Sequence, residues 1–158
     1  MGKKSVKENK NIYQQIREGL SLTREQASEL LGVISENRLV KIENETTLPQ
    51  PEDILIMAQK YKRPDLCNYY CSSVCPIGQK NVPEIKLNNL AQITMGLLAS
   101  FNNIQDYRNR LIEITADGMI TQDEIDDFKD IQKLLEAMAK SISEIQLWVE
   151  DAKVKGHM

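Results

Sequence analysis

Four polar side chains follow Ser35 within six residues: Glu36, Asn37, Arg38 and Lys41. Their hydrogen-bonding groups match base edges, because an amide suits adenine, a guanidinium or ammonium suits guanine, and a carboxylate suits cytosine. Asparagine, arginine and lysine also suit phosphate oxygens. For Arg38 the alternative is a salt link to a neighbouring glutamate, as for most surface charges. A helix that turned these side chains outward would be equipped to contact a nucleic acid.

The cysteines form the second group with possible chemistry. All three, Cys67, Cys71 and Cys75, lie in the segment CNYYCSSVCPIGQKNVP, residues 67–83, with the spacing C-x3-C-x3-C-P. Three thiolates could hold zinc with a ligand from outside, or an iron–sulfur cluster with an open position. The spacing matches no standard zinc pattern, and the only histidine, His157, is distant in the sequence. We therefore expect small, reduced thiols in a linker, with no metal or cofactor.

The segment EITADGMITQDE contains D-G-x-I-x-x-x-E, which resembles the second half of a calcium-binding loop. Glu113 and Thr115 then fall at the first two ligand positions, where such a loop requires Asp and then Asp or Asn. Gly118 and a helix cap at Thr121 explain the same residues as a turn between two helices. We therefore expect a helix–helix turn here and no metal site.

The polar residues after Ser35 belong to the segment Leu22–Glu43, which predicts two short helices joined by a tight turn. T-R-E-Q has the form of a capping box at Thr23, and Gly32 ends the first helix where a left-handed residue costs little. Ser35 is the expected cap of the second helix. The expected inward residues are Ala27, Leu30, Leu31, Leu39 and Ile42.

The run LTREQASELLGV followed by SENRLVKIE resembles the Xre/phage-repressor type of helix-turn-helix, whose members typically read L-T-Q-E-E-L-A-x-x-L-G-V-S-x-x-x-I-S-x-I-E-x-G. The resemblance covers about residues 1–65. It implies a five-helix head that inserts Ser35–Glu43 into the major groove, with Arg24 at a phosphate on the groove edge.

The sequence departs from the family pattern at three places. Arg24 replaces the family's glutamine, and Ser28 replaces its buried alanine. One extra residue, Val33 or Ile34, lies between Gly32 and Ser35. The insertion changes how the recognition helix leaves the turn.

The rest of the head is predicted from apolar spacing and prolines. A first helix places Ile12, Ile16 and Leu20 at i, i+4 and i+8. Pro51 suits the first position of a fourth helix, and Pro64 begins a fifth that runs to about Tyr70. The expected buried side of the fourth helix is Ile54, Leu55, Ala58 and Tyr61. The amino-terminal lysines, Lys3, Lys4, Lys7 and Lys10, belong either to a frayed terminus or to an arm that rests on phosphates.

From Glu84 onward the apolar spacing predicts two long helices that form a hairpin, residues 84–152. The first stripe is Leu90, Ile93, Leu97, Leu98, Phe101, Ile104, Leu111 and Ile114; the second is Ile125, Phe128, Ile131, Leu135, Met138, Ile142, Ile145 and Val149. A two-helix hairpin has little core of its own. We expect it to pair with a second copy as a four-helix bundle; the alternative is that it packs on its own head.

Composition favours helices, because aromatic residues make up only 5% of the chain and Leu, Ile, Glu, Lys and Gln are abundant. No apolar run approaches the ~20 residues of a membrane span, and the first residues do not resemble a secretory signal. We therefore expect a cytoplasmic protein. Residues 1–66 carry a net charge of +1 and residues 67–158 one of −4, a small asymmetry of the sign that a DNA-binding head requires.

These features predict an all-α protein with three parts: a helix-turn-helix head (1–66), a cysteine-containing linker (67–83) and a dimerising hairpin (84–152). The expected function is sequence-specific binding of double-stranded DNA by a homodimeric transcriptional regulator. The expected contact residues are Arg24, Ser35, Glu36, Asn37, Arg38 and Lys41.

The alternative is a protein-interaction module, an antitoxin-like or adaptor subunit, which the near-neutral head and Glu36 keep open. An enzyme is not expected, since the sequence offers no catalytic histidine, no nucleotide-binding glycine motif and no cysteine with a plausible base nearby.

Overall fold

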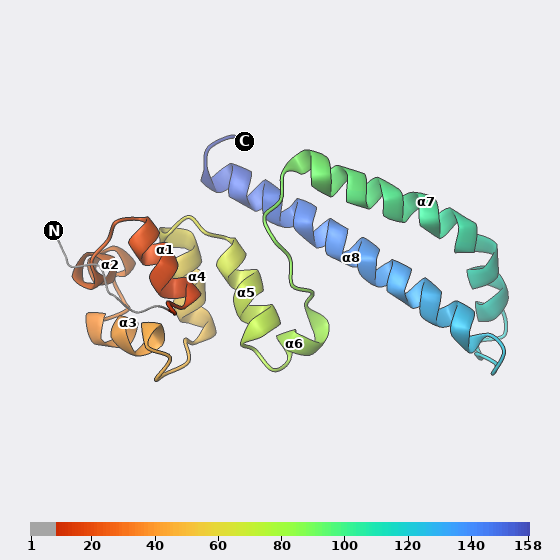
Figure 1. The fold of residues 1–158 in the computed structure, drawn as a ribbon, viewed down its shortest axis with the longest axis horizontal. Helices are drawn as coiled ribbons and strands as arrows, with labels where there is room; N and C mark the ends of the chain where they lie inside the picture. Colours follow the sequence, from red (N-terminus) through yellow and green to blue (C-terminus); the bar gives the residue numbers. More distant parts are fainter. Residues whose placement is uncertain (1–8) are drawn as a thin grey trace. The chain divides into compact units, whose positions relative to one another are not determined.

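The structure is a computed structural model that describes residues 9–158 (Figure 1). The described residues form helices and no strand, so the predicted all-α class is confirmed. They divide into two compact units, the first ending at Val82 and the second beginning at Pro83.

The first unit contains six described helices: α1 (Ile12–Gly19), α2 (Arg24–Leu31), α3 (Glu36–Glu43), α4 (Pro51–Lys60), α5 (Asp65–Ser73) and α6 (Gly78–Asn81). Local caps set where the second and third of these begin. The Thr23 hydroxyl accepts from the Gln26 amide at 3.1 Å, and the Gln26 side chain accepts from the Thr23 amide at 2.9 Å, so the predicted capping box is confirmed. The Ser35 hydroxyl accepts from the Arg38 amide, which confirms the predicted cap of α3.

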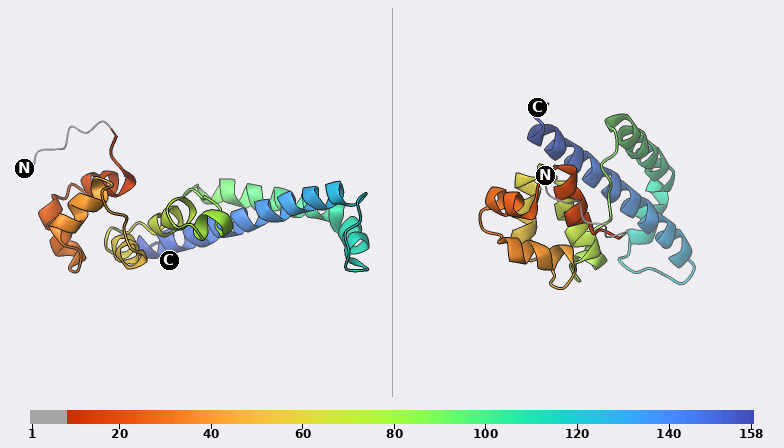
Figure 2. Two further views of the ribbon diagram at one scale, coloured as in Figure 1. Left: turned by 90° about the horizontal axis from the view of Figure 1, so that it is seen from below. Right: turned by 60° about the vertical axis from the view of Figure 1, so that its left-hand side comes forward.

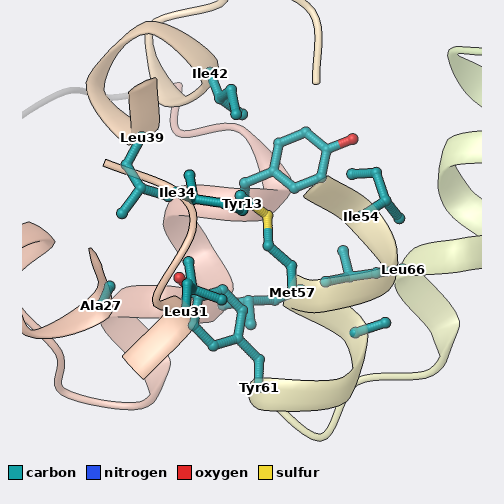
Figure 3. Packing of buried hydrophobic residues seen from close by; sticks show 12 residues of the cluster. Tyr13, Ala27, Leu31, Ile34, Leu39, Ile42, Ile54, Met57, Tyr61 and Leu66 are labelled. Atoms are coloured by element: carbon teal, nitrogen blue, oxygen red, sulfur yellow. The ribbon is translucent and has the colours of Figure 1, made fainter. Parts of the chain in front are cut away.

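The helices enclose one apolar core (Figure 3). Its buried members are Tyr13, Ile16, Ala27, Leu31, Ile34, Leu39, Ile42, Ile54, Met57, Ala58, Tyr61 and Leu66. Three predicted core residues, Leu20, Leu30 and Leu55, are instead exposed. Leu20 lies beyond the end of α1, which stops at Gly19. On α4 the buried stripe follows Ile54, Met57 and Tyr61, and this helix phase turns Leu55 outward.

Residues 67–83, expected to be a linker, contain most of α5 and all of α6. The two helices meet closely, since a Cβ atom on Gly78 would lie 2.0 Å from the carbonyl oxygen of Cys71. The three cysteines are half-buried. Among the side chains that the structure describes, no group of three or more from His, Cys, Asp and Glu is placed to hold a metal ion.

The second unit is an antiparallel hairpin of α7 (Leu90–Thr115) and α8 (Ile125–Val154), which lie side by side in all views (Figures 1 and 2). In the turn between them Gly118 has φ +73°, and the Glu124 carboxylate accepts from both the amide and the hydroxyl of Thr121. Among the described helices, none is long and apolar enough to span a membrane.

Candidate nucleic-acid interface

Helix α3 has one buried face and one open face. Leu39 and Ile42 are buried in the core of the first unit, as predicted. Glu36, Asn37 and Lys41 are exposed on the other side. The open face therefore carries a carboxylate, an amide and an ammonium within two helical turns, a set of groups that can hydrogen-bond to base edges or phosphates.

Glu43, at the carboxyl end of α3, fixes that end in place. Its side chain is only 1% exposed. It accepts two hydrogen bonds from Arg17 of α1, Nε to Oε1 at 2.6 Å and Nη2 to Oε2 at 2.9 Å, and one from Arg24 Nε at 2.8 Å. The bond to Glu43 raises the pKa of Arg17, as expected when a guanidinium donates to a carboxylate. A buried carboxylate shared by two guanidiniums thus joins α3 to α1 and α2.

A second pair fastens the amino-terminal half of α3. Arg38 donates to Asp53 of α4, from Nε to Oδ1 at 3.1 Å and from Nη2 to Oδ2 at 2.5 Å. Asp53 also accepts from the Gln50 amide at 2.8 Å, at the start of α4. Burial raises the pKa of Asp53, but the bonds from Arg38 and Gln50 outweigh it and hold that pKa below its ordinary value. The partner of Arg38 is therefore Asp53, and not a neighbouring glutamate.

The turn between α2 and α3 shows which residue is the extra one. Ile34 is 1% exposed and fills the apolar position before the cap, whereas Val33 is 75% exposed. The Ser28 hydroxyl donates to the Ile34 carbonyl at 2.8 Å. The serine that replaces the family's alanine therefore adds a hydrogen bond that stabilises the turn. Gly32 has φ 76° and ψ −48°, and the Val33 amide donates to the Leu31 carbonyl, which together form a γ-turn. Val33 is the inserted residue.

The predicted contact residues thus fall into two groups. Glu36, Asn37 and Lys41 lie together on the open face of α3, with Ser35 exposed at its cap. Arg24 and Arg38 are tied to carboxylates of the same unit. Sequence reasoning missed Glu43 and Asp53 as their partners. The family pattern contains a glutamate after its second isoleucine, at the position of Glu43. That glutamate was the one sequence feature that could have marked Glu43 as a structural residue.

The proposed phosphate-contacting arm is only partly described. Lys10 pairs with Glu18 of α1 at 2.7 Å, which places its charge on the first unit. Lys3, Lys4 and Lys7 lie outside the described residues.

A family model described as helix-turn-helix matches residues 14–65, which run from α1 to the start of α5. With the motif and the geometry above, this makes the segment a helix-turn-helix domain of the class found in DNA-binding regulators. It is of the Xre/phage-repressor type, so the resemblance drawn from the sequence is confirmed. Comparisons with curated proteins and with solved structures gave no match.

Proposed function

We propose that the protein is a sequence-specific, DNA-binding transcriptional regulator that inserts α3 into the major groove of double-stranded DNA. The observation that carries the proposal is the open face of α3. Glu36, Asn37 and Lys41 point away from the core, while pairs at Arg38 and Glu43 fix the helix along its length. A rigid helix that presents polar groups is what base readout requires.

Arg24 and Arg38, although paired with carboxylates, can still contact DNA phosphates. A guanidinium has five N–H donors, and the bond from Arg24 to Glu43 uses Nε. Arg24 sits at the first position of α2 and its side chain is about a third exposed. Arg24 can therefore donate to a DNA phosphate while it keeps its bond to Glu43. A phosphate contact of this kind would fix the register of the protein on the DNA backbone. Arg38 can do the same while it stays on Asp53.

The hairpin supports action as a homodimer. Large apolar side chains are exposed on both of its helices: Leu98, Phe101 and Ile112 on α7, and Leu135 and Ile142 on α8, each between 44% and 58% exposed. Successive residues of a helix are about 100° apart around its axis. On both helices, the exposed apolar residues are rotated away from the buried residues in the same direction when each helix is followed from its amino end. Because the helices run antiparallel, both sets fall on one side of the hairpin. A contiguous apolar face of this kind favours a partner, and a second hairpin would complete a four-helix bundle.

A dimer of helix-turn-helix domains has a geometric consequence. Two copies of α3 related by a two-fold axis read half-sites that are inverted and about 10 base pairs apart, or a multiple of that. We expect the protein to act in the cytoplasm, where it would meet such sites on duplex DNA.

The test is selection of binding sites from random duplex DNA by the full chain, followed by binding to the selected site over a range of salt. We expect a palindromic site and an affinity that falls linearly with salt on logarithmic axes. An enriched pool that shows no sequence preference would contradict specific readout. No binding to any duplex would instead favour the interaction module of the antitoxin-like or adaptor kind.

A further inference from the structure

We propose that Val33, the inserted residue of the helix-turn-helix turn, contacts the 5-methyl group of a thymine in the major groove. This inference rests on the DNA binding proposed above. It adds one residue and one chemical group to the readout, at a position that the family pattern does not contain.

The structure holds Val33 outward from both sides. Behind it, Ile34 is buried in the core, and the Ser28 hydroxyl holds the Ile34 carbonyl. Before it, the γ-turn at Gly32, with φ +76°, reverses the chain. The space beside Gly32 is open, since a Cβ atom added there would have no neighbouring heavy atom within 4 Å. The insertion is therefore accommodated by moving Val33 into solvent, while the apolar packing of the turn is kept.

Its place in the chain puts Val33 beside the end of α3 that recognition helices use. It lies two residues before the cap Ser35 and three before Glu36. In helix-turn-helix complexes the amino-terminal residues of the second helix contact base edges. If Glu36 and Asn37 reach the bases, a side chain that projects from the preceding turn lies against the adjacent base pair.

The chemistry of the side chain selects its target. Valine can neither donate nor accept a hydrogen bond, and the thymine methyl is the one apolar group on the major-groove edges of the four bases. A polar base edge placed there would lose water without gaining a partner. The β-branch leaves Val33 few rotamers, so little side-chain entropy is lost on contact.

The experiment replaces single thymines by deoxyuridine in one half-site of the selected duplex, which removes the methyl group and nothing else. For the wild-type protein we expect one thymine whose replacement weakens binding about four-fold, equivalent to the ~0.8 kcal/mol of one buried methyl group. For Val33→Ala we expect weaker binding to the duplex with thymine, and no additional loss when that thymine is replaced by deoxyuridine. The matched control, Leu55→Ala, truncates another exposed apolar side chain, on α4, and should keep the four-fold sensitivity.

The outcomes separate this inference from the proposed function. Specific binding in which no thymine shows the effect, or in which Val33→Ala keeps it, overturns the role of Val33 and leaves the regulator intact. Failure to bind any duplex overturns both. Circular dichroism of Val33→Ala should match wild type, because the side chain is exposed and contributes little to the fold.

Discussion

The first unit buries several charged groups and pairs them with one another, whereas the second unit exposes a row of apolar side chains and most of its charges. Asp151, buried and paired with Lys155, is an exception in the second unit. In the head, Glu43 and Arg17 are almost fully buried and bonded to each other, and Asp53 is nearly so. In the hairpin, the pairs Lys129–Asp126 and Lys133–Asp130 have both partners more than half exposed. Leu98, Phe101, Ile112, Leu135 and Ile142 are exposed with them.

The contrast indicates two different ways of reaching a stable structure. The head has a core of its own, and buried ion pairs fix how its helices meet, because a buried charge without its partner is costly. In the hairpin each helix packs on one other helix and apolar surface stays uncovered, so a partner that covered this surface would add stability. The orientation of α3 is thus fixed within one chain. In the proposed homodimer, the spacing of the two α3 helices would instead depend on how the two hairpins pair.

The largest expected effect tests the buried side of this contrast. Glu43→Gln leaves Arg17 buried with a neutral partner, and breaking a buried pair in this way typically costs about 3–5 kcal/mol of folding free energy. Urea unfolding followed by far-ultraviolet circular dichroism measures it.

The control is Glu29→Gln, which makes the same chemical change at an exposed position of α2 and should stay within about 0.5 kcal/mol of wild type. Equal losses in the two variants would show that the Glu43 network contributes nothing particular to the head.

The parts of the head that sequence could predict are local ones. The capping box at Thr23, the cap at Ser35 and the inward pair Leu39 and Ile42 depend on residues three or four positions apart, and the structure has all of them. The Glu43 network joins residues that are 26 and 19 positions apart. No local spacing encodes such a pair, so only the family pattern could have pointed to it.

Apolar residues were harder to place than caps. Leu55 has the composition of a core residue, but the phase of α4 is set by what packs on it, and Met57 is buried instead. In α8 the seven-residue spacing predicted Leu135 and Ile142 on the inner seam. The structure instead buries Leu134 and Ser141, one position earlier in each case. Neighbouring positions lie about 100° apart around a helix, so the row that faces α7 is the one beside the predicted row. Part of the predicted seam is therefore the open face.

The next effect concerns that open face. Phe101→Lys places a charge in the middle of it, where each copy of a symmetric dimer would lose about 1.5–3 kcal/mol of apolar burial. We expect the variant to be monomeric in light scattering at micromolar concentration, with wild type dimeric.

Asn103→Lys adds the same charge two positions along α7, at an exposed site about 200° around the helix from Phe101, and should remain a dimer. A wild-type chain that is itself monomeric under these conditions would remove the homodimer from the proposal while leaving the head unaffected.

A smaller effect compares two cations of α3 that differ in their surroundings. Lys41 is exposed, whereas Arg38 is bonded to Asp53. Lys41→Ala should weaken DNA binding without lowering thermal stability. It should reduce the salt slope by about one if Lys41 meets a phosphate, or cost about 1–3 kcal/mol at one base pair if it meets a base.

Arg38→Ala should lower both DNA affinity and thermal stability, because it also releases α3 from α4. Binding isotherms at several salt concentrations, together with melting curves, measure both quantities. Unchanged affinity in both variants would show that another face of α3, or another element, meets the DNA.

The smallest effect is the acid sensitivity of the tie between α3 and α4. Burial raises the pKa of Asp53, while hydrogen bonds from Arg38 and the Gln50 amide lower it further than burial raises it. A carboxyl whose pKa is lower in the folded state stabilises the fold above its unfolded value, near 3.9. That contribution is lost as the pH falls from about 4 through the lowered folded value.

Asp53→Asn should therefore flatten the pH dependence of unfolding free energy in this acid range, by less than about 1 kcal/mol for a pair that is partly exposed. Arg38→Gln keeps the carboxyl but removes the bonds from the guanidinium, so it should flatten the same part of the curve. Urea unfolding at a series of pH values from neutral to acid measures both variants against wild type. If the three curves stay parallel below pH 4, the pair with Arg38 does not set the titration of Asp53, and α3 is held on α4 by its apolar face alone.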